Sequence, residues 1–101
     1  MLRIVDAAAA ISDPIRRRVL ELVRDREVAA GELAAEFTVS RPAVSRHLRV
    51  LRESGLVHER RVGRRRLYRA DPEPLAELRD WLEGYWSGRL ESLKRVAEEE
   101  R

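Results

Sequence analysis

The sequence contains no cysteine. A disulfide framework, a thiolate metal site and a thiol redox switch are therefore excluded, and the composition is compatible with a reducing cytosol. No apolar run approaches the ~18 residues of a membrane-spanning helix. The first residues, MLRIVDAAAAISDP, lack the long leucine-rich stretch and the cleavage site of a signal peptide. We therefore expect a soluble cytoplasmic protein with no membrane partner.

Residues that could build a catalytic or metal centre are also scarce. The chain has two histidines, and it has no Gly-x-Ser-x-Gly motif, no phosphate-binding glycine loop and no paired His-Glu motif. A zinc site needs three or four nitrogen, sulfur or carboxylate ligands in a tetrahedral cluster, which two separated histidines do not supply. We expect a protein that is not an enzyme and that carries no cofactor and no metal.

Positive charge is concentrated in the middle of the chain. The length of 101 residues fits a single domain. Residues 41–69 hold ten arginines and two glutamates, a net charge of +8, whereas residues 1–40 carry −1 and residues 70–101 carry −4. On charge alone, this distribution indicates either a surface that faces a polyanion or an arginine-rich face that is merely solvated.

Start and stop signals predict three helices before the basic segment. Residues 3–11 place apolar side chains at helical spacing. Asp13 and Pro14 form an N-cap and a first helical position, which predicts a second helix over residues 13–25. Residues 31–37 predict a third helix that is too short to be stable alone.

The basic segment begins with a predicted fourth helix, SRPAVSRHLRVLRES, over residues 40–54. Ser40 is a good N-cap, Pro42 lies in the first turn, and Gly55 suits the left-handed residue that ends a helix. Because successive residues turn by ~100°, one face of this helix is apolar and the other is cationic. The cationic side carries Arg41, Ser45, Arg49 and Arg52, with Arg46 further around.

After this helix the apolar period changes to two. Residues 56–62 and 65–71 are strand-like, and the glycine in the two-residue connection between them is a hairpin signal. Six arginines crowd the predicted hairpin and its tip: Arg60, Arg61, Arg64, Arg65, Arg66 and Arg69.

A long last helix is predicted over residues 72–101. Gly84 and Gly88 inside it each cost ~1 kcal/mol relative to alanine, so we expect a bend there or close packing against another helix. The fold class is then mainly α with a small β-hairpin, in one domain over residues 1–101. Its elements are three helices, a cationic fourth helix, two strands and a long C-terminal helix.

This order of elements describes a winged helix-turn-helix. In such a fold the fourth helix enters the major groove of DNA, and the hairpin arginines follow the DNA backbone or enter the minor groove. The deep, narrow major groove of double-stranded RNA cannot admit such a helix. We therefore favour a sequence-specific reader of duplex DNA over the alternative, a winged-helix module that binds RNA or a protein partner.

Three blocks resemble the ArsR family of bacterial and archaeal transcriptional regulators: DPIRRRVLELV at 13–23, ELAAEFTVSRPAVSRHLRVLRESGLV at 32–57 and GRRRLYRADPEPL at 63–75. The resemblance covers nearly the whole chain, and SRHLRVLRESGLV is its most specific part. It implies a dimeric winged-helix repressor that binds operator DNA and pairs through its first and last helices. In many members a small-molecule effector releases the DNA.

The resemblance and the cationic helix face together assign candidate residues. The recognition helix contributes Ser40, Arg41, Pro42, Ser45, Arg46, His47 and Arg49, and the wing contributes Arg60, Arg61, Arg64, Arg65 and Arg66. Residues 1–12 and 72–101 are the expected dimerisation helices, with Ile4, Ala8, Leu78, Trp81, Leu82, Tyr85 and Trp86 at the interface. A two-fold axis would make the operator an imperfect palindrome.

The departures from the family pattern place the chain in a branch that does not sense metal. Metal-sensing members have a cysteine pair where this chain reads Ala-Ala-Gly-Glu at 29–32. Other members bind zinc between C-terminal helices through histidines and carboxylates, and this chain has no histidine after His58. We therefore expect no metal ligands.

Two alternatives stay open. His47 has three candidate roles: an internal hydrogen bond, a phosphate contact or a base contact. The aromatic cluster at 81–86 is either dimer core alone or also the wall of an apolar ligand pocket. No feature of the sequence identifies an effector.

Overall fold

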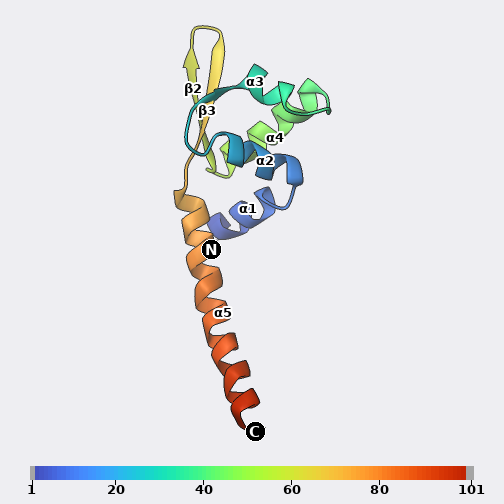
Figure 1. Cartoon of the computed structure of the whole chain (residues 1–101). Helices are drawn as coiled ribbons and strands as arrows, with labels where there is room; N and C mark the ends of the chain where they lie inside the picture. The colour runs from blue at the N-terminus through green and yellow to red at the C-terminus, as the bar shows by residue number, and fades with distance from the viewer. Residues whose placement is uncertain (1, 100–101) are drawn as a thin grey trace.

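The computed structural model of the chain, which describes residues 2–99, has five helices and three strands (Figure 1). Met1, Glu100 and Arg101 lie outside the described residues, and with them the ends of the two expected dimerisation segments. The predicted order of helices and hairpin is confirmed. The elements are α1 (Leu2–Ala10), α2 (Pro14–Leu22), β1 (Val28–Ala29), α3 (Ala30–Ala35), α4 (Arg41–Glu53), β2 (Val57–Val62), β3 (Arg65–Ala70) and α5 (Glu73–Glu99).

Cap residues determine where α2 and α4 begin. The Asp13 carboxylate accepts hydrogen bonds from two backbone N–H groups of α2, at 2.8 and 3.2 Å. The Ser40 hydroxyl accepts one backbone N–H of α4 at 3.3 Å. Gly55, with a φ of +76°, follows the end of α4. These three predictions are confirmed, because each residue satisfies backbone groups that a helix end leaves unpaired.

The sheet has one strand more than the predicted hairpin. β2 and β3 pair as predicted, from Val57 opposite Ala70 to Val62 opposite Arg65. β1 adds to the other edge of β3, with Val28 opposite Tyr68, and the strand order is β1-β3-β2. Two residues are too few to show a period of two, so β1 has no signal in the sequence.

The core lies between α1, α2, α3, α4 and the sheet. The apolar face predicted for the fourth helix is buried, with Val44, Leu48 and Leu51 at 3% exposure or less. They pack in one cluster with apolar side chains of the other elements, among them Val19, Leu33, Leu56 and Tyr68. The opposite, cationic face of α4 therefore remains in solvent, as its periodicity predicts.

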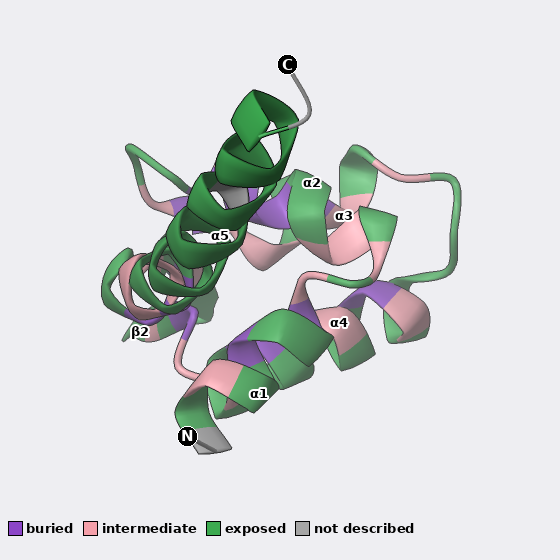
Figure 2. Ribbon diagram, turned by 90° about the horizontal axis from the view of Figure 1, so that it is seen from below, coloured by how far each residue is buried: buried purple, intermediate pink, exposed green. Residues whose placement is uncertain are grey.

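The C-terminal helix leaves this core and extends into solvent. α5 begins beside α1, and Figures 1 and 2 show the rest of it standing out from the body, with exposed residues along its length. It is one continuous helix through Gly84 and Gly88, and apart from the neighbouring residues and backbone of the helix itself no atom lies within 4 Å of a Cβ placed on either glycine. Close packing against another helix is therefore not found at either glycine within the described residues, and the predicted bend stays a prediction. No helix among them is long and apolar enough to cross a membrane.

The Asp13 cap makes a testable contribution to stability. Asp13→Ala should lower the free energy of unfolding by about 1 kcal/mol at neutral pH, because two N–H groups lose their acceptor. Burial acts to raise the pKa of Asp13, but hydrogen bonds from the backbone of Arg16 and Ile15 outweigh it and hold the pKa below 3.8. The contribution is therefore fully present above the ordinary pKa and is lost as the pH falls through the folded-state pKa.

Urea unfolding of three proteins across acid and neutral pH tests this prediction. Asp13→Asn is the matched control, because an asparagine side chain caps a helix about as well as aspartate but does not ionise. The difference in unfolding free energy between the wild type and Asp13→Ala should shrink as the pH falls through the lowered folded-state pKa of Asp13 and the carboxylate becomes protonated. A difference in unfolding free energy that stays constant between neutral and acid pH would contradict a carboxylate cap.

Candidate nucleic-acid interface

The exposed face of α4 carries three cationic side chains that have no acidic partner in the described part of the chain. Arg41, Ser45, Arg46 and Arg49 are all exposed. Within residues 2–99, no ion pair of 4.0 Å or less joins Arg41, Arg46 or Arg49 to a carboxylate. An unpaired guanidinium keeps all its donors available for an external anion or a guanine edge. The cationic side predicted for this helix is therefore present as an exposed surface whose charges are not neutralised by described carboxylates.

His47 lies away from this cationic surface and contacts α2. Its Nδ1 atom is 3.1 Å from a guanidinium nitrogen of Arg16, and its side chain is 19% exposed. The guanidinium can only donate, so Nδ1 accepts in this contact, and the Asp13 carboxylate lies 3.9 Å from the same ring atom. Arg16 also donates to the backbone carbonyl of Ala10, at 2.6 Å, and so joins the end of α1 to α4. This geometry supports the internal hydrogen bond among the three roles considered for His47.

The wing arginines divide between the two faces of the hairpin. Glu59 lies opposite Tyr68 and Arg61 opposite Arg66, so these four side chains share one face of the β2–β3 ladder. This is the face that meets α4, because Tyr68 and Arg66 line a hollow together with residues of α4. Arg64 lies at the tip, beside Gly63 with its φ of +61°. Arg61, Arg64 and Arg66 are exposed.

The other face of the hairpin holds the two remaining wing arginines, which are paired with acids. Arg60 donates twice to the Glu27 carboxylate, at 2.9 and 2.7 Å. These hydrogen bonds are the main reason that the pKa of Glu27 lies below its ordinary value. Arg65 lies 3.5 Å from the Glu32 carboxylate of α3. Sequence patterning did not separate these two arginines from the rest, because their acidic partners come from distant segments.

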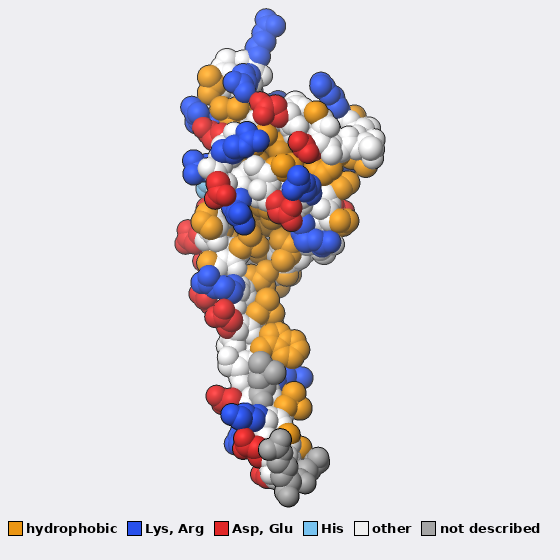
Figure 3. Space-filling view, in the orientation of Figure 1, with side chains coloured by type: hydrophobic (Ala, Val, Ile, Leu, Met, Phe, Trp, Pro, Cys, Tyr) orange, Lys and Arg blue, Asp and Glu red, His pale blue; other side chains and the backbone are white. Residues whose placement is uncertain are grey.

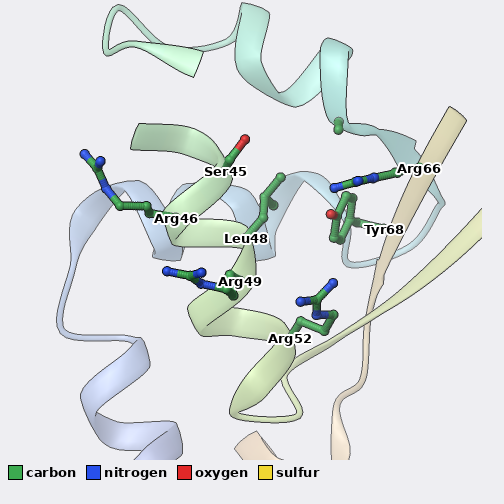
Figure 4. Close-up of a pocket in the computed structure, with 8 residues that line it drawn as sticks. Ser45, Arg46, Leu48, Arg49, Arg52, Arg66 and Tyr68 are labelled. Carbon is green, nitrogen blue, oxygen red and sulfur yellow. The ribbon is translucent and has the colours of Figure 1, made fainter. Parts of the chain in front are cut away.

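A hollow of about 250 Å³ lies between α4 and the wing (Figure 4). In Figure 4 the Arg66 side chain reaches from β3 toward α4, beside the ring of Tyr68, whereas Arg46 points away from the wing. The hollow thus joins α4 to the hairpin in one cationic surface. It is lined by Ala30, Ser45, Arg46, Leu48, Arg49, Arg52, Arg66 and Tyr68.

Glu59 connects the two sides of this surface. One carboxylate oxygen accepts a hydrogen bond from Arg52 of α4, at 2.8 Å, and another from the Tyr68 hydroxyl, at 3.0 Å. The other oxygen lies 3.4 Å from Nε of Arg61. The glutamate side chain is only 11% exposed. Glu59 is not among the residues predicted for the site, although a two-residue hairpin connection is enough to place it opposite Tyr68.

A second surface, apolar and uncovered, follows α5. Trp81, Leu82, Tyr85 and Trp86 are 38 to 51% exposed, and Figure 3 shows apolar side chains along one side of the helix. The rings of Trp81 and Tyr85 stack at 5.8 Å. Beside them, a groove of about 350 Å³ is lined by Ile11, Leu75, Leu78, Arg79, Leu82, Glu83 and Trp86.

The other predicted interface residues differ in how much surface they offer. Ala8 is exposed, and Ile4 is partly buried against the chain's own core. Leu78 is 7% exposed and belongs to that core, so little of its surface remains for a partner. Sequence periodicity placed Leu78 on the apolar side of α5 but could not show that the same chain already covers it.

The acidic and histidine side chains do not form a metal centre in the described part of the chain. No group of three or more histidine, cysteine, aspartate or glutamate side chains is arranged there to hold a metal ion. His58 pairs instead with Asp71, at 2.9 Å, on the exposed side of the hairpin.

Comparison with known proteins identifies the family. The model of a family described as "Bacterial regulatory protein, arsR family" matches residues 13–59, from the cap of α2 into β2. The HTH-type transcriptional regulator Rv2034 of Mycobacterium tuberculosis is 42% identical over 91 residues, which cover 90% of this chain and 85% of that protein. The chain belongs to the arsR family. It is therefore a DNA-binding transcriptional regulator, and the prediction that it is not an enzyme is confirmed.

Two further comparisons with transcriptional regulators agree. The transcriptional repressor SdpR of Bacillus subtilis is 33% identical, over 72% of this chain and 81% of that protein. The ArsR-like transcriptional regulator from Rhodococcus sp. RHA1 superposes with a TM-score of 0.80 and 34% identity, covering 96% of this chain and 92% of that one. The predicted family and the winged helix-turn-helix fold are both confirmed.

Proposed function

We propose that this arsR-family regulator acts in the cytoplasm as a homodimeric repressor that binds a palindromic operator. The observation that carries the proposal is the surface of arginines from α4 and the wing that have no acidic partner within the described residues: Arg41, Arg46, Arg49, Arg64 and Arg66. Duplex DNA presents one phosphate charge per ~1.7 Å of helix axis, and arginine binds both phosphates and guanine edges. Repression is further supported by the name of the relative SdpR, a transcriptional repressor.

The residues of the surface have different roles in this proposal. Ser45, Arg46 and Arg49 read base edges in the major groove, where arginine forks onto guanine. Ser40, Arg41 and Pro42 hold the N-terminal end of α4 against the DNA backbone. Arg64 and Arg66 contact phosphates from the wing, whereas Arg61 is held by the Glu59 carboxylate. Arg60 and Arg65 contribute less, because Glu27 and Glu32 neutralise them.

The homodimer in this proposal forms through α1 and α5, the helices within the predicted dimerisation segments 1–12 and 72–101. Support comes from the uncovered aromatic side chains of α5, since large aromatic area is typical of the buried centre of an interface. A second copy would cover the groove beside Leu82 and Trp86. Two recognition helices related by a two-fold axis then reach two half-sites of DNA.

Selection of bound duplexes from a random library tests the proposed function. The expected product is an imperfect palindrome whose half-sites lie about one helical turn apart. The selected sequence prepared as duplex RNA should not compete for binding, since its major groove does not admit α4. Failure to enrich any sequence, or equal binding of the RNA duplex, would favour the alternative of a module that binds RNA or a protein.

Metal ions should not act as the effector of this regulator. Zinc, cadmium and arsenite are each expected to leave operator affinity unchanged, because no thiolate is present and the described residues form no cluster of metal ligands. Fluorescence anisotropy with a labelled operator measures this directly. A metal-dependent loss of affinity of about tenfold or more would overturn the assignment to a branch that does not sense metal.

A further inference from the structure

Glu59 is a nearly buried carboxylate inside a surface proposed to bind a polyanion. A negative charge at such a surface weakens phosphate binding, so its position needs an explanation. Its partners come from three elements: Arg52 from α4, Tyr68 from β3 and Arg61 from β2 itself. Glu59 therefore both fixes the wing against the recognition helix and occupies two of the arginines of the surface.

The protonation states of Glu59 and Tyr68 favour hydrogen bonds that persist at neutral pH. Burial acts to raise the pKa of the Glu59 carboxyl, but the hydrogen bonds from Tyr68, Arg52 and Arg61 outweigh it and hold the pKa below its ordinary value. Burial and the bond to Glu59 raise the pKa of the Tyr68 hydroxyl. At neutral pH the carboxylate thus accepts and the hydroxyl donates, and Tyr68 is itself anchored in the core at 4% exposure.

We propose that Glu59 is a specificity-determining positioning residue of the DNA-binding surface. This role of Glu59 rests on the proposed function, in which α4 and the wing bind duplex DNA. By holding Arg52 and Arg61 in fixed directions, Glu59 sets the distance between α4 and the wing to that required by one DNA geometry. It also keeps these two long cationic side chains from binding phosphates of any sequence, which is the main source of non-specific affinity.

A charge-matched pair of variants tests the proposal. Glu59→Gln keeps the length of the side chain and a carbonyl oxygen that can accept the Tyr68 hydroxyl, but it removes the charge that holds Arg52 and Arg61. Glu27→Gln makes the same change of charge on the other face of the wing, where it releases Arg60. Anisotropy titrations of both variants with the selected operator and with a random duplex, at several salt concentrations, give affinity and salt slope.

The two variants should differ on random and on operator DNA. For Glu59→Gln we expect affinity for random DNA to rise about threefold, with a salt slope steeper by about one. The ratio of operator to random affinity should fall about tenfold, because the two DNA-contacting elements lose their fixed separation. For Glu27→Gln the ratio should stay within about twofold of wild type.

A second variant separates positioning from a merely structural role. Tyr68→Phe retains the core ring and removes only the hydroxyl that orients Glu59, so the operator-to-random ratio should fall in the same direction but less. In the Glu59→Gln background the same substitution should add nothing to the change in the operator-to-random ratio, because the charge that holds Arg52 and Arg61 is already absent. Circular dichroism and urea unfolding identify the folded variants.

Three outcomes would overturn the inference. The first is an equal effect of Glu59→Gln and Glu27→Gln on the ratio, which would reduce the effect to net charge. The second is an equal loss on operator and random DNA with Glu59→Gln, which would make Glu59 a structural residue only. The third is an additive effect of Tyr68→Phe in the double variant. In each case a wild type that selects an operator leaves the proposed function intact, whereas a wild type that selects none refutes the proposed function itself.

Discussion

Leu82→Asp and Trp86→Asp should each convert the proposed dimer into a monomer and reduce operator affinity by about a hundredfold or more. Both side chains are substantially exposed in the single chain, so neither substitution opens a cavity in the core. An unpaired carboxylate costs several kcal/mol to bury in an apolar interface, and Arg79, the one cation among the described residues that line the groove here, is already paired with Asp80 and Glu83. The monomer then loses the second half-site, and the gain from two linked binding events disappears.

Analytical ultracentrifugation gives the oligomeric state of these variants, and anisotropy gives their operator affinity. Val62→Asp is the matched control, since it introduces the same charge at a valine that is 44% exposed on the wing, far from α5. This control should remain a dimer. If both α5 variants sediment as dimers, the contact between two copies does not use the Leu82–Trp86 surface, and another face of the chain must pair.

Most of the fold could be predicted because its signals are local. The Asp13 and Ser40 caps, Gly55 and the Gly63 turn each act within a few residues of their own position, where hydrogen bonding and φ limit the choices. β1 could not be predicted, because it is two residues long and exists only through pairing with β3. Its position depends on a strand that follows it by almost forty residues in the chain.

The candidate site was harder to predict than the fold, because long-range pairs decide which arginines are available. All five predicted wing arginines look alike in sequence. Glu27 and Glu32 neutralise two of them from segments more than thirty residues away, and Glu59 occupies Arg61 from within the hairpin. The face of each side chain was nevertheless implicit in the two-residue connection, since that connection fixes the register and the register fixes the faces.

Arg46→Ala should lower affinity for the selected operator by about ten- to a hundredfold and leave affinity for random DNA nearly unchanged. A bidentate arginine–guanine contact provides about 1–3 kcal/mol of discrimination. The Arg46 side chain is exposed on α4 and has no acidic partner among residues 2–99. Arg66→Ala should instead weaken operator and random DNA by the same factor and reduce the salt slope by about one, because a phosphate contact carries no sequence information.

Arg60→Ala is the matched control for these two variants. It removes the same charge from the same hairpin, but its guanidinium is already held by two hydrogen bonds to Glu27, so both affinities should change by less than about twofold. Titrations of the three variants against operator and random duplexes at several salt concentrations separate base reading from phosphate binding. Equal losses for Arg60→Ala and Arg66→Ala would show that both faces of the hairpin meet DNA. A loss for Arg46→Ala that is the same on both duplexes would remove Arg46 from the base-reading residues and leave Ser45 and Arg49 to carry that role.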